Sequence, residues 1–461
     1  MSNIKPSLPK GTRDFSPSEV VKRNYIFQTI TSVFKKFGYQ EIQTPTMENL
    51  STLTGKYGNE GDKLIFKVLN SGDYLAKADN QKLLNKNSSQ LTSEISDKAL
   101  RYDLTVPFAR YVVMHQNEIA FPFKRYQVQP VWRADRPQKG RYREFYQCDA
   151  DVVGSESLLN EAEFVLIYDE ALSLLGLKNF TIKINNRKIL SGIAELVGKP
   201  ELIVDMTVAI DKLDKIGLDG VCAELQERGF TSSDIDKLKP AILLEGSNIQ
   251  KIAALRQVLA KSETGLTGIK EIETIFEYLK SFDLYNATIE LDITLARGLN
   301  YYTGAIFEVK TNEAAMGSIG GGGRYDDLTG MFGLKNLTGV GISFGADRIY
   351  DVLEELILFP NSTHQTTKVL ISNFDSQAEQ YALPLLQQLR RKGIAAELYP
   401  SAAKLKKQMS YADDKKIQYV LLIGSDEMES GRLTLKNMHS GEQEKLTAVE
   451  LLERFNHPEV S

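Results

Sequence analysis

The sequence predicts an α+β protein with an inserted helical domain and a C-terminal α/β domain. Three observations support this prediction. Two strand-like runs with a period of two residues flank a loop containing Pro and Gly between residues 123 and 154. Residues 187–286 have the pattern of consecutive short helices. Beyond residue 368, strand and helix patterns alternate, which favours a small separate domain with a mixed sheet.

Composition limits the class of protein. With 461 residues, 42% apolar and 25% charged, the chain is expected to form about three globular domains. Its two cysteines, Cys148 and Cys222, predict neither a disulfide framework nor a thiolate metal site. The four histidines lack ligand spacing, which argues against zinc. Because no run reaches about 18 apolar residues and the start lacks an apolar segment, we expect a soluble, cytoplasmic protein without a membrane partner.

The N-terminal elements are predicted from local signals. Residues 16–38 are expected to form a helix, because Ser16-Pro17-Ser18-Glu19 is a capping box with Pro at the first helical position, and Gly38 can end the helix. A strand follows at 39–45. Residues 62–75 are expected to form a hairpin, and the Asn- and Ser-rich residues 80–98 a loop without special chemistry.

A polar face is predicted next. Residues 100–107 read as a short strand that turns into a helix ending near His115. Alternation places Arg101, Asp103 and Thr105 on one face of that strand. By itself, an alternating polar face is most often simply solvated.

The most informative stretch is the hairpin at 123–154. Its second strand alternates so that Phe145, Gln147, Asp149 and Asp151 share one face. Residues 124–143 carry seven basic side chains against one acid, Asp135, in a chain of net charge −4; the seven are Lys124, Arg125, Arg133, Arg136, Lys139, Arg141 and Arg143. Guanidinium groups suit phosphates, so this stretch predicts a site for a small zwitterion beside a nucleotide. A hairpin with a solvated basic tip is the alternative.

The middle of the chain is predicted in the same way. A helix is expected at 155–176 and a strand at 181–186. The helices of the inserted segment are expected at 189–197, 205–216, 218–227, 232–238, 249–260 and 269–279. Strands resume at 287–295 and 305–310. The four glycines from Gly320 to Gly323 would let the backbone pass close to a ligand.

The end of the larger part combines a strand and a helix. A strand from residue 339 turns at Gly345 into a helix that carries Arg348. The glycines here do not have the G-x-G-x-x-G spacing and no βαβ unit surrounds them, which argues against a dinucleotide site.

After a polar linker, the C-terminal segment alternates. Strands are expected at 368–374, 394–399, 418–423 and 432–437, and helices at 376–392, 404–415 and 448–455. Five lysines crowd residues 404–416. Such a helix is usually a solvated face, but in a nucleic-acid-binding protein it would contact backbone phosphates.

Taken together, these motifs resemble a known family. Their order resembles the three signature motifs of class II aminoacyl-tRNA synthetases. Within that class, RYDLT at 101–105, RGLNYYTG at 297–304 and GGGGRYD at 320–326 resemble histidyl-tRNA synthetases, and the resemblance extends from Gly11 to about residue 455. The sequence also argues independently against a class I synthetase, because it has no HxGH, no full KMSKS and no Walker A motif.

The resemblance implies a domain organisation. Residues 1–186 and 287–360 would form the two parts of an antiparallel-sheet catalytic core, and 187–286 an inserted helical domain that contacts the tRNA acceptor arm. Residues 361–367 would be a linker, and 368–461 an anticodon-binding domain with a mixed sheet. The resemblance also implies a homodimer that binds tRNA(His).

The resemblance further implies the site residues. Arg133, Arg297 and Arg348 would be the catalytic arginines that hold phosphates during ATP-dependent activation of histidine, with Mg²⁺ bridging the outer phosphates. Asp135, Arg141 and Phe145 would contact ATP together with Arg133 and Arg348. Histidine would be bound by Asp103, Leu104, Thr105, Arg133, Gln147, Asp151, Arg297, Tyr301, Tyr302 and Tyr325, with Asp151 and Tyr302 as the imidazole partners.

The sequence departs from the family pattern at two places, and two other functions were considered. Many bacterial members have RPEGT where this chain has RYDLT, and Glu where it has Asp151; both changes keep a carboxylate but alter its reach by a methylene. A non-catalytic histidine sensor or regulator on the same core is one alternative, although such regulators typically lack the insert and the C-terminal domain. A synthetase for proline, threonine or glycine is the other, and it should lack RGLNYY and GGRYD.

Overall fold

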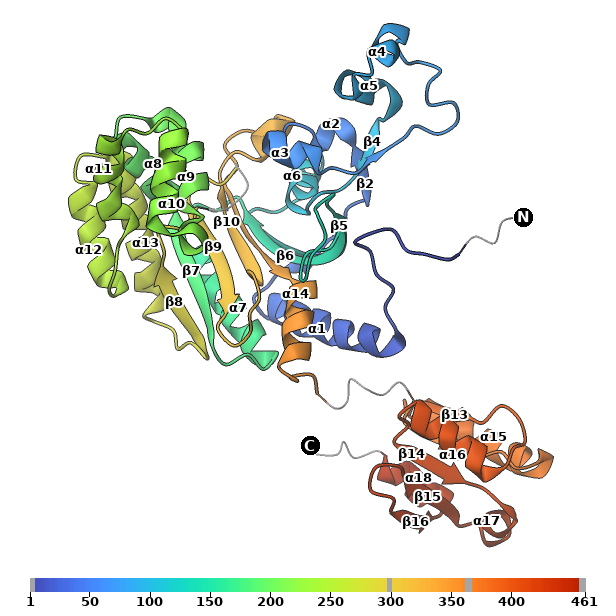
Figure 1. The fold of residues 1–461 in the computed structure, drawn as a ribbon. Helices are drawn as coiled ribbons and strands as arrows, with labels where there is room; N and C mark the ends of the chain where they lie inside the picture. Colours follow the sequence, from blue (N-terminus) through green and yellow to red (C-terminus); the bar gives the residue numbers. More distant parts are fainter. Residues whose placement is uncertain (1–4, 297–300, 361–366, 456–461) are drawn as a thin grey trace. The chain divides into compact units, whose positions relative to one another are not determined.

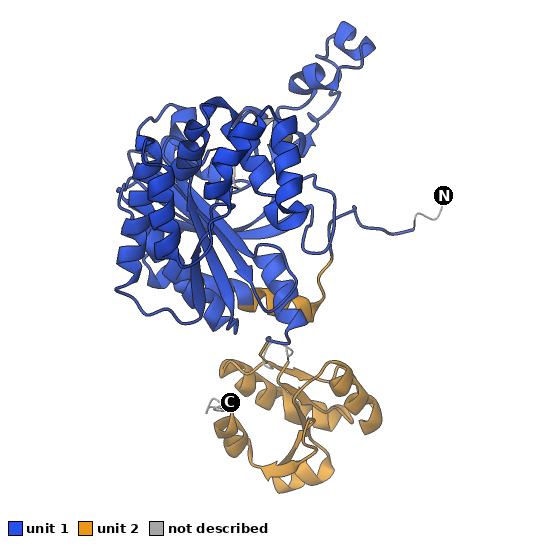
Figure 2. Cartoon of the chain, turned by 60° about the vertical axis from the view of Figure 1, so that its left-hand side comes forward, with its two compact units in different colours: residues 1–13, 26–358 blue, residues 14–25, 359–461 orange. Residues whose placement is uncertain are grey.

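The computed structural model describes residues 5–296, 301–360 and 367–455. These form two compact units, residues 1–13 with 26–358 and residues 14–25 with 359–461 (Figure 2). Each unit is built on its own large sheet (Figure 1). Within the described residues, no helix is both long and apolar enough to span a membrane.

The larger unit is centred on an eight-stranded sheet. Its order is β1-β5-β6-β11-β10-β9-β7-β8, with bounds Gln40–Glu41, Phe123–Trp132, Glu144–Val153, Gly339–Gly345, Gly320–Tyr325, Ala305–Thr311, Phe180–Asn186 and Ala287–Leu291. The two pairings at the edges, β1 with β5 and β7 with β8, are parallel, and all those between are antiparallel. The antiparallel core implied by the sequence motifs is therefore confirmed.

Helices cover one face of this sheet. The helices are α1 (Pro17–Lys36), α7 (Leu159–Leu174) and α14 (Ala346–Glu355), which gather below the sheet in Figure 1. Phe34 of α1 and Tyr168 of α7 both pack against Phe344 of β11, with ring centroids 5.8 and 4.7 Å apart. Both residues are fully buried, as is Phe344, so this face holds much of the apolar core. The opposite face is left for the site.

The inserted helices were predicted correctly in kind. They are α8 (Arg187–Leu196), a 3₁₀ turn (Pro200–Leu202), α9 (Ile203–Ile210), α10 (Leu213–Glu227), α11 (Ser232–Ile242), α12 (Asn248–Val258) and α13 (Glu263–Leu279). The predicted break between the second and third helices coincides with a kink at Gly217, whereas the break at residues 211–212 was not predicted. The chain turns at residues 211–212 and α10 is kinked at Gly217, whose φ of 67° is left-handed.

The predictions for residues 62–98 were wrong. The chain forms α3 (Gly58–Lys63), β3 (Lys67–Val68), α4 (Asn80–Leu84) and α5 (Ser88–Ile95), and β3 joins β2 (Met47–Asn49) and β4 (Lys98–Leu100) in a small sheet in the order β2-β4-β3. No hairpin turns at residues 71–73, because the partner of β3 is β4. The polar residues cap helices: Asp79 accepts from the backbone of Gln81 and Lys82, and Asn87 from that of Gln90.

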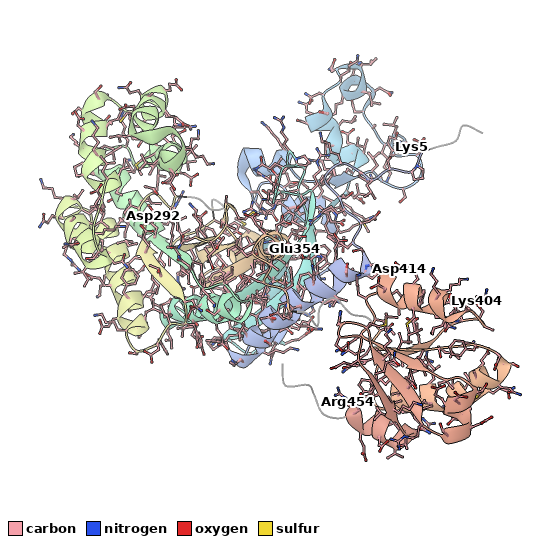
Figure 3. The ribbon with its side chains drawn as sticks, turned by 60° about the horizontal axis from the view of Figure 1, so that its bottom comes forward. Lys5, Asp292, Glu354, Lys404, Asp414 and Arg454 are labelled. Carbon is pink, nitrogen blue, oxygen red and sulfur yellow. The ribbon has the colours of Figure 1, made fainter. Side chains whose placement is uncertain are left out.

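The smaller unit carries a five-stranded mixed sheet, as predicted. The order is β13-β12-β14-β15-β16 (Ala396–Leu398, Val369–Ile371, Tyr419–Leu422, Leu433–Asn437 and Gln443–Leu446), parallel over the first three strands and antiparallel after them. Its helices are α15 (Ser376–Arg391), α16 (Leu405–Asp414), α17 (Ser425–Ser430) and α18 (Ala448–Arg454). Lys404 and Asp414 mark the ends of α16 in Figure 3. Neither α17 nor β16 was predicted from the sequence.

The glycine run 320–323 forms strand β10, and Gly320, Gly321 and Gly322 line cavities of the larger unit. A Cβ atom on Gly322 would lie 2.1 Å from the carbonyl oxygen of Gly341 on β11, and one on Gly323 would lie 2.8 Å from the ring of Tyr302. The run is thus needed for close packing inside the protein.

This packing gives a test of stability. Gly322→Ala should lower the free energy of unfolding by about 1–3 kcal/mol or more, because the methyl group collides with backbone atoms that cannot move aside. The matched control is Gly345→Ala on β11, where the nearest atom to an added Cβ is 3.5 Å away. Urea unfolding followed by fluorescence of Trp132, the one tryptophan, reports on this sheet directly. Equal midpoints for the two variants would contradict the packing argument.

Candidate active site

Two adjoining cavities lie on the sheet face opposite the covering helices. The first, of about 360 Å³, is lined by Asp103, Thr105, Gln147, Asp149, Asp151, the three tyrosines at 301, 302 and 325, and others. The second, of about 400 Å³, is lined by the loop after Arg133 and the start of α14. Arg133 and Arg348 line both cavities. An arginine pair therefore stands where the two cavities meet.

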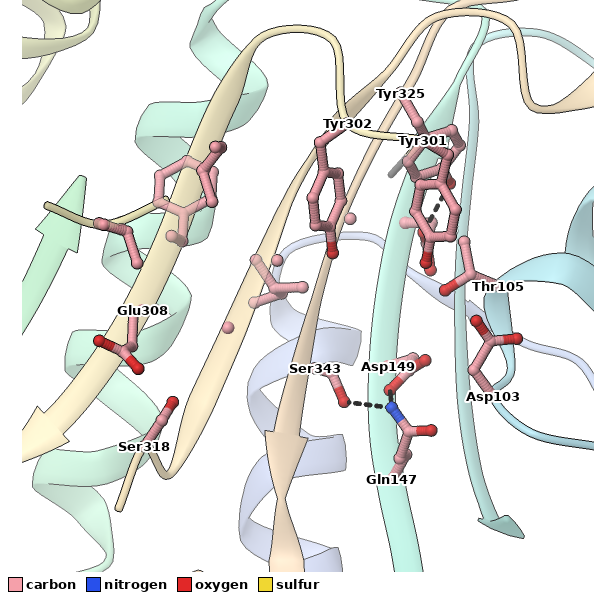
Figure 4. Close-up of a pocket in the computed structure, with 18 of the residues that line it drawn as sticks. Asp103, Thr105, Gln147, Asp149, Tyr301, Tyr302, Glu308, Ser318, Tyr325 and Ser343 are labelled. Carbon is pink, nitrogen blue, oxygen red and sulfur yellow. Dashed lines mark hydrogen bonds between the residues drawn. The ribbon is translucent and has the colours of Figure 1, made fainter. Parts of the chain in front are cut away.

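Strand β6 supplies the floor of the first cavity. Gln147, Asp149 and Asp151 are alternate residues, so their side chains share one face. Across the ladder on β11 they pair with Gly345, Ser343 and Gly341, which are all small. The floor is therefore polar and open. In Figure 4, Asp103 and Thr105 stand at one end of this floor and Glu308 and Ser318 at the other.

Asp151 is held from two sides. It accepts a hydrogen bond of 2.5 Å from the hydroxyl of Tyr325, and it forms an ion pair of 2.6 Å with Arg125, which is fully buried on β5. The guanidinium of Arg125 also lies 4.2 Å from the centre of the Phe108 ring. A Cβ atom on Gly341 would lie 1.9 Å from an oxygen of Asp151, so glycine is needed there. Burial raises the pKa of Asp151, and the charge of Arg125 opposes that rise.

Asp103 stands at the start of α6 (Thr105–Met114). Its Oδ1 accepts from the hydroxyl of Tyr57 at 2.9 Å and from the backbone of Val106 at 3.1 Å. Its Oδ2 is buried and has no hydrogen-bond partner among the described residues, and the same holds for Oε1 of Gln147. Two acceptor atoms with unused capacity thus border one cavity, which suits an ammonium group.

Asp149 is a member of the site that the sequence motifs missed. It is 2% exposed, lines the first cavity, and its Oδ1 accepts from Nε2 of Gln147 at 3.5 Å (Figure 4). Burial raises its pKa to about 7, against the opposing charge of Arg125. The signal was present, because alternation already placed Asp149 on the face of Gln147 and Asp151. The site residues implied by the family resemblance did not include Asp149, so it was not predicted as part of the site.

The arginines at the junction are anchored through the backbone. Nε of Arg133 donates to the carbonyl of Tyr102 at 3.0 Å, and its guanidinium lies 4.3 Å from the centre of the Tyr102 ring. Arg348 donates to the carbonyls of Gly140 at 2.7 Å and Ser318 at 2.6 Å. These contacts to backbone carbonyls fix the position of both guanidinium groups at the junction of the two cavities.

The predicted nucleotide residues come together in the second cavity. Asp135, Arg141 and Phe145 all line it. Arg141 forms an ion pair of 2.7 Å with Asp135, which is 7% exposed. Phe145 faces the cavity from the start of β6.

Some predicted residues lie elsewhere. Leu104 is fully buried and lines neither cavity. Arg297 lies outside the described residues. The predicted strand at 100–107 was wrong, because β4 ends at Leu100 and α6 begins at Thr105. Asp103 and Thr105 nevertheless line the first cavity together, whereas Arg101 is fully buried with its guanidinium on the carbonyls of Thr44 and Pro130.

The basic cluster of the hairpin is not a single patch. Lys124 pairs with Glu163 at 2.6 Å, Lys139 with Glu355 at 3.0 Å, and Arg125 is buried on Asp151. Of the seven basic residues, Arg133 and Arg141 line the cavities. Sequence proximity therefore overstated the size of the anion-binding surface.

Comparison with known proteins decides the family. The model of the family described as histidyl-tRNA synthetase matches residues 11–79 and 85–349, and that of the anticodon binding domain matches residues 368–457. This chain belongs to the histidyl-tRNA synthetase family. The structure confirms the α+β, class II synthetase fold that the motifs implied.

The similarity to family members covers nearly the whole chain. The chain is 60% identical to the histidine–tRNA ligase of Phocaeicola vulgatus over 97% of this chain and 98% of that protein, and 61% identical to that of Christiangramia forsetii over 96% and 97%. The crystal structure of histidyl-tRNA synthetase from Nostoc sp. PCC 7120 superposes with a TM-score of 0.82 at 32% identity, over 98% of this chain and 99% of that one. A structure from Bacillus halodurans, titled as a regulatory subunit or histidyl-tRNA synthetase, is 22% identical and shows the fold alone.

The buried position of Asp149 predicts a pH-dependent stability. Because the folded chain keeps the Asp149 proton up to about pH 7 while the unfolded chain loses it near 3.8, the free energy of unfolding falls as pH rises through this range. Asp149→Asn removes this titration. The unaltered protein should therefore lose stability relative to the variant as the pH rises from about 5 to about 8. The difference in melting temperature, variant minus unaltered protein, should become more positive over this range.

Calorimetry at several pH values measures this difference. Asp97→Asn, at a side chain that is 63% exposed, is the matched control. A difference that stays constant across the range for Asp149→Asn would contradict the assignment of a buried, late-titrating carboxyl group.

Proposed function

We propose that the chain is a histidine–tRNA ligase that joins histidine to ATP and then transfers histidine to the terminal ribose of tRNA(His). The observation that carries this is the pair of adjoining cavities with Arg133 and Arg348 lining both. One cavity offers acceptors for an amino acid, and the other offers cations and an aromatic ring for a nucleotide. Membership of the family, at about 60% identity over nearly the full chain, supports histidine and tRNA(His) as the substrates.

Histidine would enter the first cavity with its ammonium group toward Asp103. Oδ2 of Asp103 and Oε1 of Gln147 are the acceptors with unused capacity, and Thr105 lies beside them. Tyr301 and Tyr325 would line the pocket, and Leu104 would support it from the core. The polar groups of the site thus match an ammonium ion on one side and an imidazole on the other.

The imidazole would lie between Asp151 and Tyr302. Tyr325 and Arg125 hold Asp151 in place, so its carboxylate is fixed before the ligand arrives. A site that hydrogen-bonds a polar side chain rejects analogues lacking that group by about 10⁴–10⁵-fold, because its buried polar atoms are then left without partners. This discrimination makes a separate editing site unnecessary.

ATP would occupy the second cavity with its α-phosphate at the junction. Arg133 would hold the histidine carboxylate and the α-phosphate, and Arg297 would approach that phosphate from the other side. Arg348 and Phe145 would lie on opposite faces of the adenine, with Asp135 and Arg141 also on the nucleotide. The two arginines that line both cavities, Arg133 and Arg348, support this arrangement.

The reaction needs positioning rather than a protein nucleophile. A carboxylate oxygen of histidine attacks the α-phosphorus, an acyl–O–P bond forms, and the bond to the pyrophosphate oxygen breaks, so that pyrophosphate leaves with the electron pair. Catalysis then depends on alignment and on cations that stabilise charge in the transition state. Arg133, Arg297 and Arg348 would do this work.

Mg²⁺ would accompany ATP. Such an ion keeps several waters and binds mainly through the phosphates plus one or two carboxylates. No cluster of three or more potential ligands is found among the residues that the structure describes. Asp135 lines the second cavity and Glu308 the first, and each could supply a carboxylate to such an ion.

The remaining assignments concern partners. The unit at 368–457 matches the anticodon binding domain and would read the anticodon of tRNA(His). The inserted helices would contact the acceptor arm, and two copies of the chain would form a homodimer in the cytoplasm. Sedimentation at micromolar concentration tests the dimer.

The deciding experiment is ATP–pyrophosphate exchange with each of the twenty amino acids. We expect exchange with histidine alone, because only histidine satisfies both the ammonium acceptors and the imidazole partners. Absence of exchange with every amino acid, despite measurable histidine binding, would replace this proposal with a non-catalytic histidine sensor. Exchange with another amino acid would overturn the specificity assignment.

A variant tests the ammonium site. Asp103→Asn keeps the size of the side chain but removes its charge, so the KM for histidine should rise by roughly 10–100-fold while the KM for ATP stays nearly constant. Asp97→Asn, at an exposed position, is the control. An unchanged KM for histidine would place the ammonium group elsewhere.

A further inference from the structure

An N-terminal arm lies against the wall of the second cavity. Residues 5–13 precede the first helix and form no helix or strand. The carbonyl of Gly11 accepts a hydrogen bond of 2.8 Å from the backbone of Arg143, and the carbonyl of Lys10 accepts one of 3.4 Å from its guanidinium. The arm is thus attached to the end of the loop that follows Arg133.

The attachment requires glycine at position 11. Gly11 has a φ of 88°, in the left-handed region that glycine adopts readily. A Cβ atom there would lie 2.8 Å from Cγ of Arg143 and 2.9 Å from Cγ of Pro137. Since both atoms belong to the same loop, the arm and the loop are packed in direct contact.

Arg13 extends this attachment to a second element. Its guanidinium lies 3.4 Å from the centre of the Tyr142 ring, and Nη2 pairs with Oδ1 of Asp347 in the first turn of α14. The other oxygen of Asp347 accepts from the backbone of Tyr146 at 2.8 Å. Tyr142 donates to Asp351 at 3.1 Å. Arg13 therefore joins the loop to the helix that carries Arg348.

Both partners of Arg13 line the nucleotide cavity. Tyr142 and Asp347 belong to its wall, whereas Arg13 itself does not. Arg348 follows Asp347 directly and donates to the carbonyl of Gly140 in the same loop. A shift of the loop relative to α14 would consequently move the very groups that hold Arg348 in place.

The charge of Arg13 has a second consequence. Asp347 is 3% exposed and faces a cavity that would receive a polyphosphate. Without a cation beside it, this carboxylate would repel the phosphates of ATP through a medium of low dielectric constant. Arg13 pairs with Asp347 from outside the cavity and so weakens this repulsion.

We propose that Arg13 is a positioning residue for ATP: it clamps the loop at 134–143 to the start of α14 and neutralises Asp347, and so sets the place of Arg348 and the charge of the nucleotide cavity. This inference rests on the proposed ligase function. It assigns to the arm a role in nucleotide binding that none of the sequence motifs indicated, because Arg13 is far from Arg348 in sequence and does not line the nucleotide cavity.

The test is the kinetics of ATP–pyrophosphate exchange in Arg13→Ala. The KM for ATP should rise by about 5–30-fold, since a cation–π contact and an ion pair are lost together, whereas the KM for histidine should change by less than about two-fold. Arg13→Lys keeps the charge near Asp347 and should recover part of the affinity for ATP. Lys5→Ala, at an exposed residue of the same arm labelled in Figure 3, is the matched control and should behave as the unaltered protein.

A double variant separates the two effects. Asp347→Asn in the Arg13→Ala background removes the carboxylate that has lost its ion pair with Arg13, so the KM for ATP should fall below that of Arg13→Ala alone if charge contributes. No such fall would overturn the electrostatic half of the proposal. An Arg13→Ala enzyme with an unchanged KM for ATP would overturn the whole of it.

A purely structural role gives a different result. If Arg13 only stabilised the fold, Arg13→Ala would lower the melting temperature and the active fraction while the KM values for ATP and histidine kept their values, and this outcome also overturns the proposal. Histidine binding by calorimetry without ATP shows whether the first cavity is intact in the variant. Failure of this proposal can be distinguished from failure of the proposed ligase function. In the second case the unaltered protein itself would show no histidine-dependent ATP–pyrophosphate exchange.

Discussion

The ion pair between Arg125 and Asp151 is the constraint on which the rest of the site depends. Three carboxylates, Asp103, Asp149 and Asp151, are buried at one cavity, and burial raises the pKa of each. Such a group of like charges is stable only beside a fixed cation, and breaking a buried pair typically costs about 3–5 kcal/mol. Arg125 supplies that cation from β5, Asp151 receives it on β6, and the hydroxyl of Tyr325 brings in β10. The pair thus ties together the strands that form the floor.

This constraint explains the distribution of small residues around it. Gly341 leaves room for the Asp151 carboxylate, and Gly322 and Gly323 let β10 approach β11 and Tyr302 closely. The sheet can then present a polar floor on one face while Phe34, Tyr168 and Phe344 fill the other. The result is a rigid surface with fixed acceptors, which suits a reaction in which alignment and charge, rather than a protein nucleophile, lower the barrier.

Much of the fold could be predicted from local patterns, and the failures have identifiable causes. The hairpin at 123–154, the inserted helices and the mixed sheet of the smaller unit follow from periodicity and capping, which act over a few residues. Residues 62–98 were mispredicted because their Asn and Asp residues serve as helix caps, and composition does not distinguish a cap from a loop. Arg101 was placed on a polar face because the local sequence alternates like a strand, whereas its guanidinium is buried and donates to backbone carbonyls inside the protein.

By itself, the sequence determined which chemical groups the site would contain: the motif arginines, the acceptors on β6 and the tyrosines, since alternation along a strand and short motifs are local properties. Only the tertiary structure decided which of those groups line the cavities and which are paired elsewhere. It buried Arg125 on Asp151, paired Lys124 and Lys139 with acids outside the cavities, added Asp149 to the floor, and brought Arg13 to Asp347. These pairings join residues up to 334 positions apart, and their energy depends on burial and on distances set by the whole fold, which no local pattern encodes.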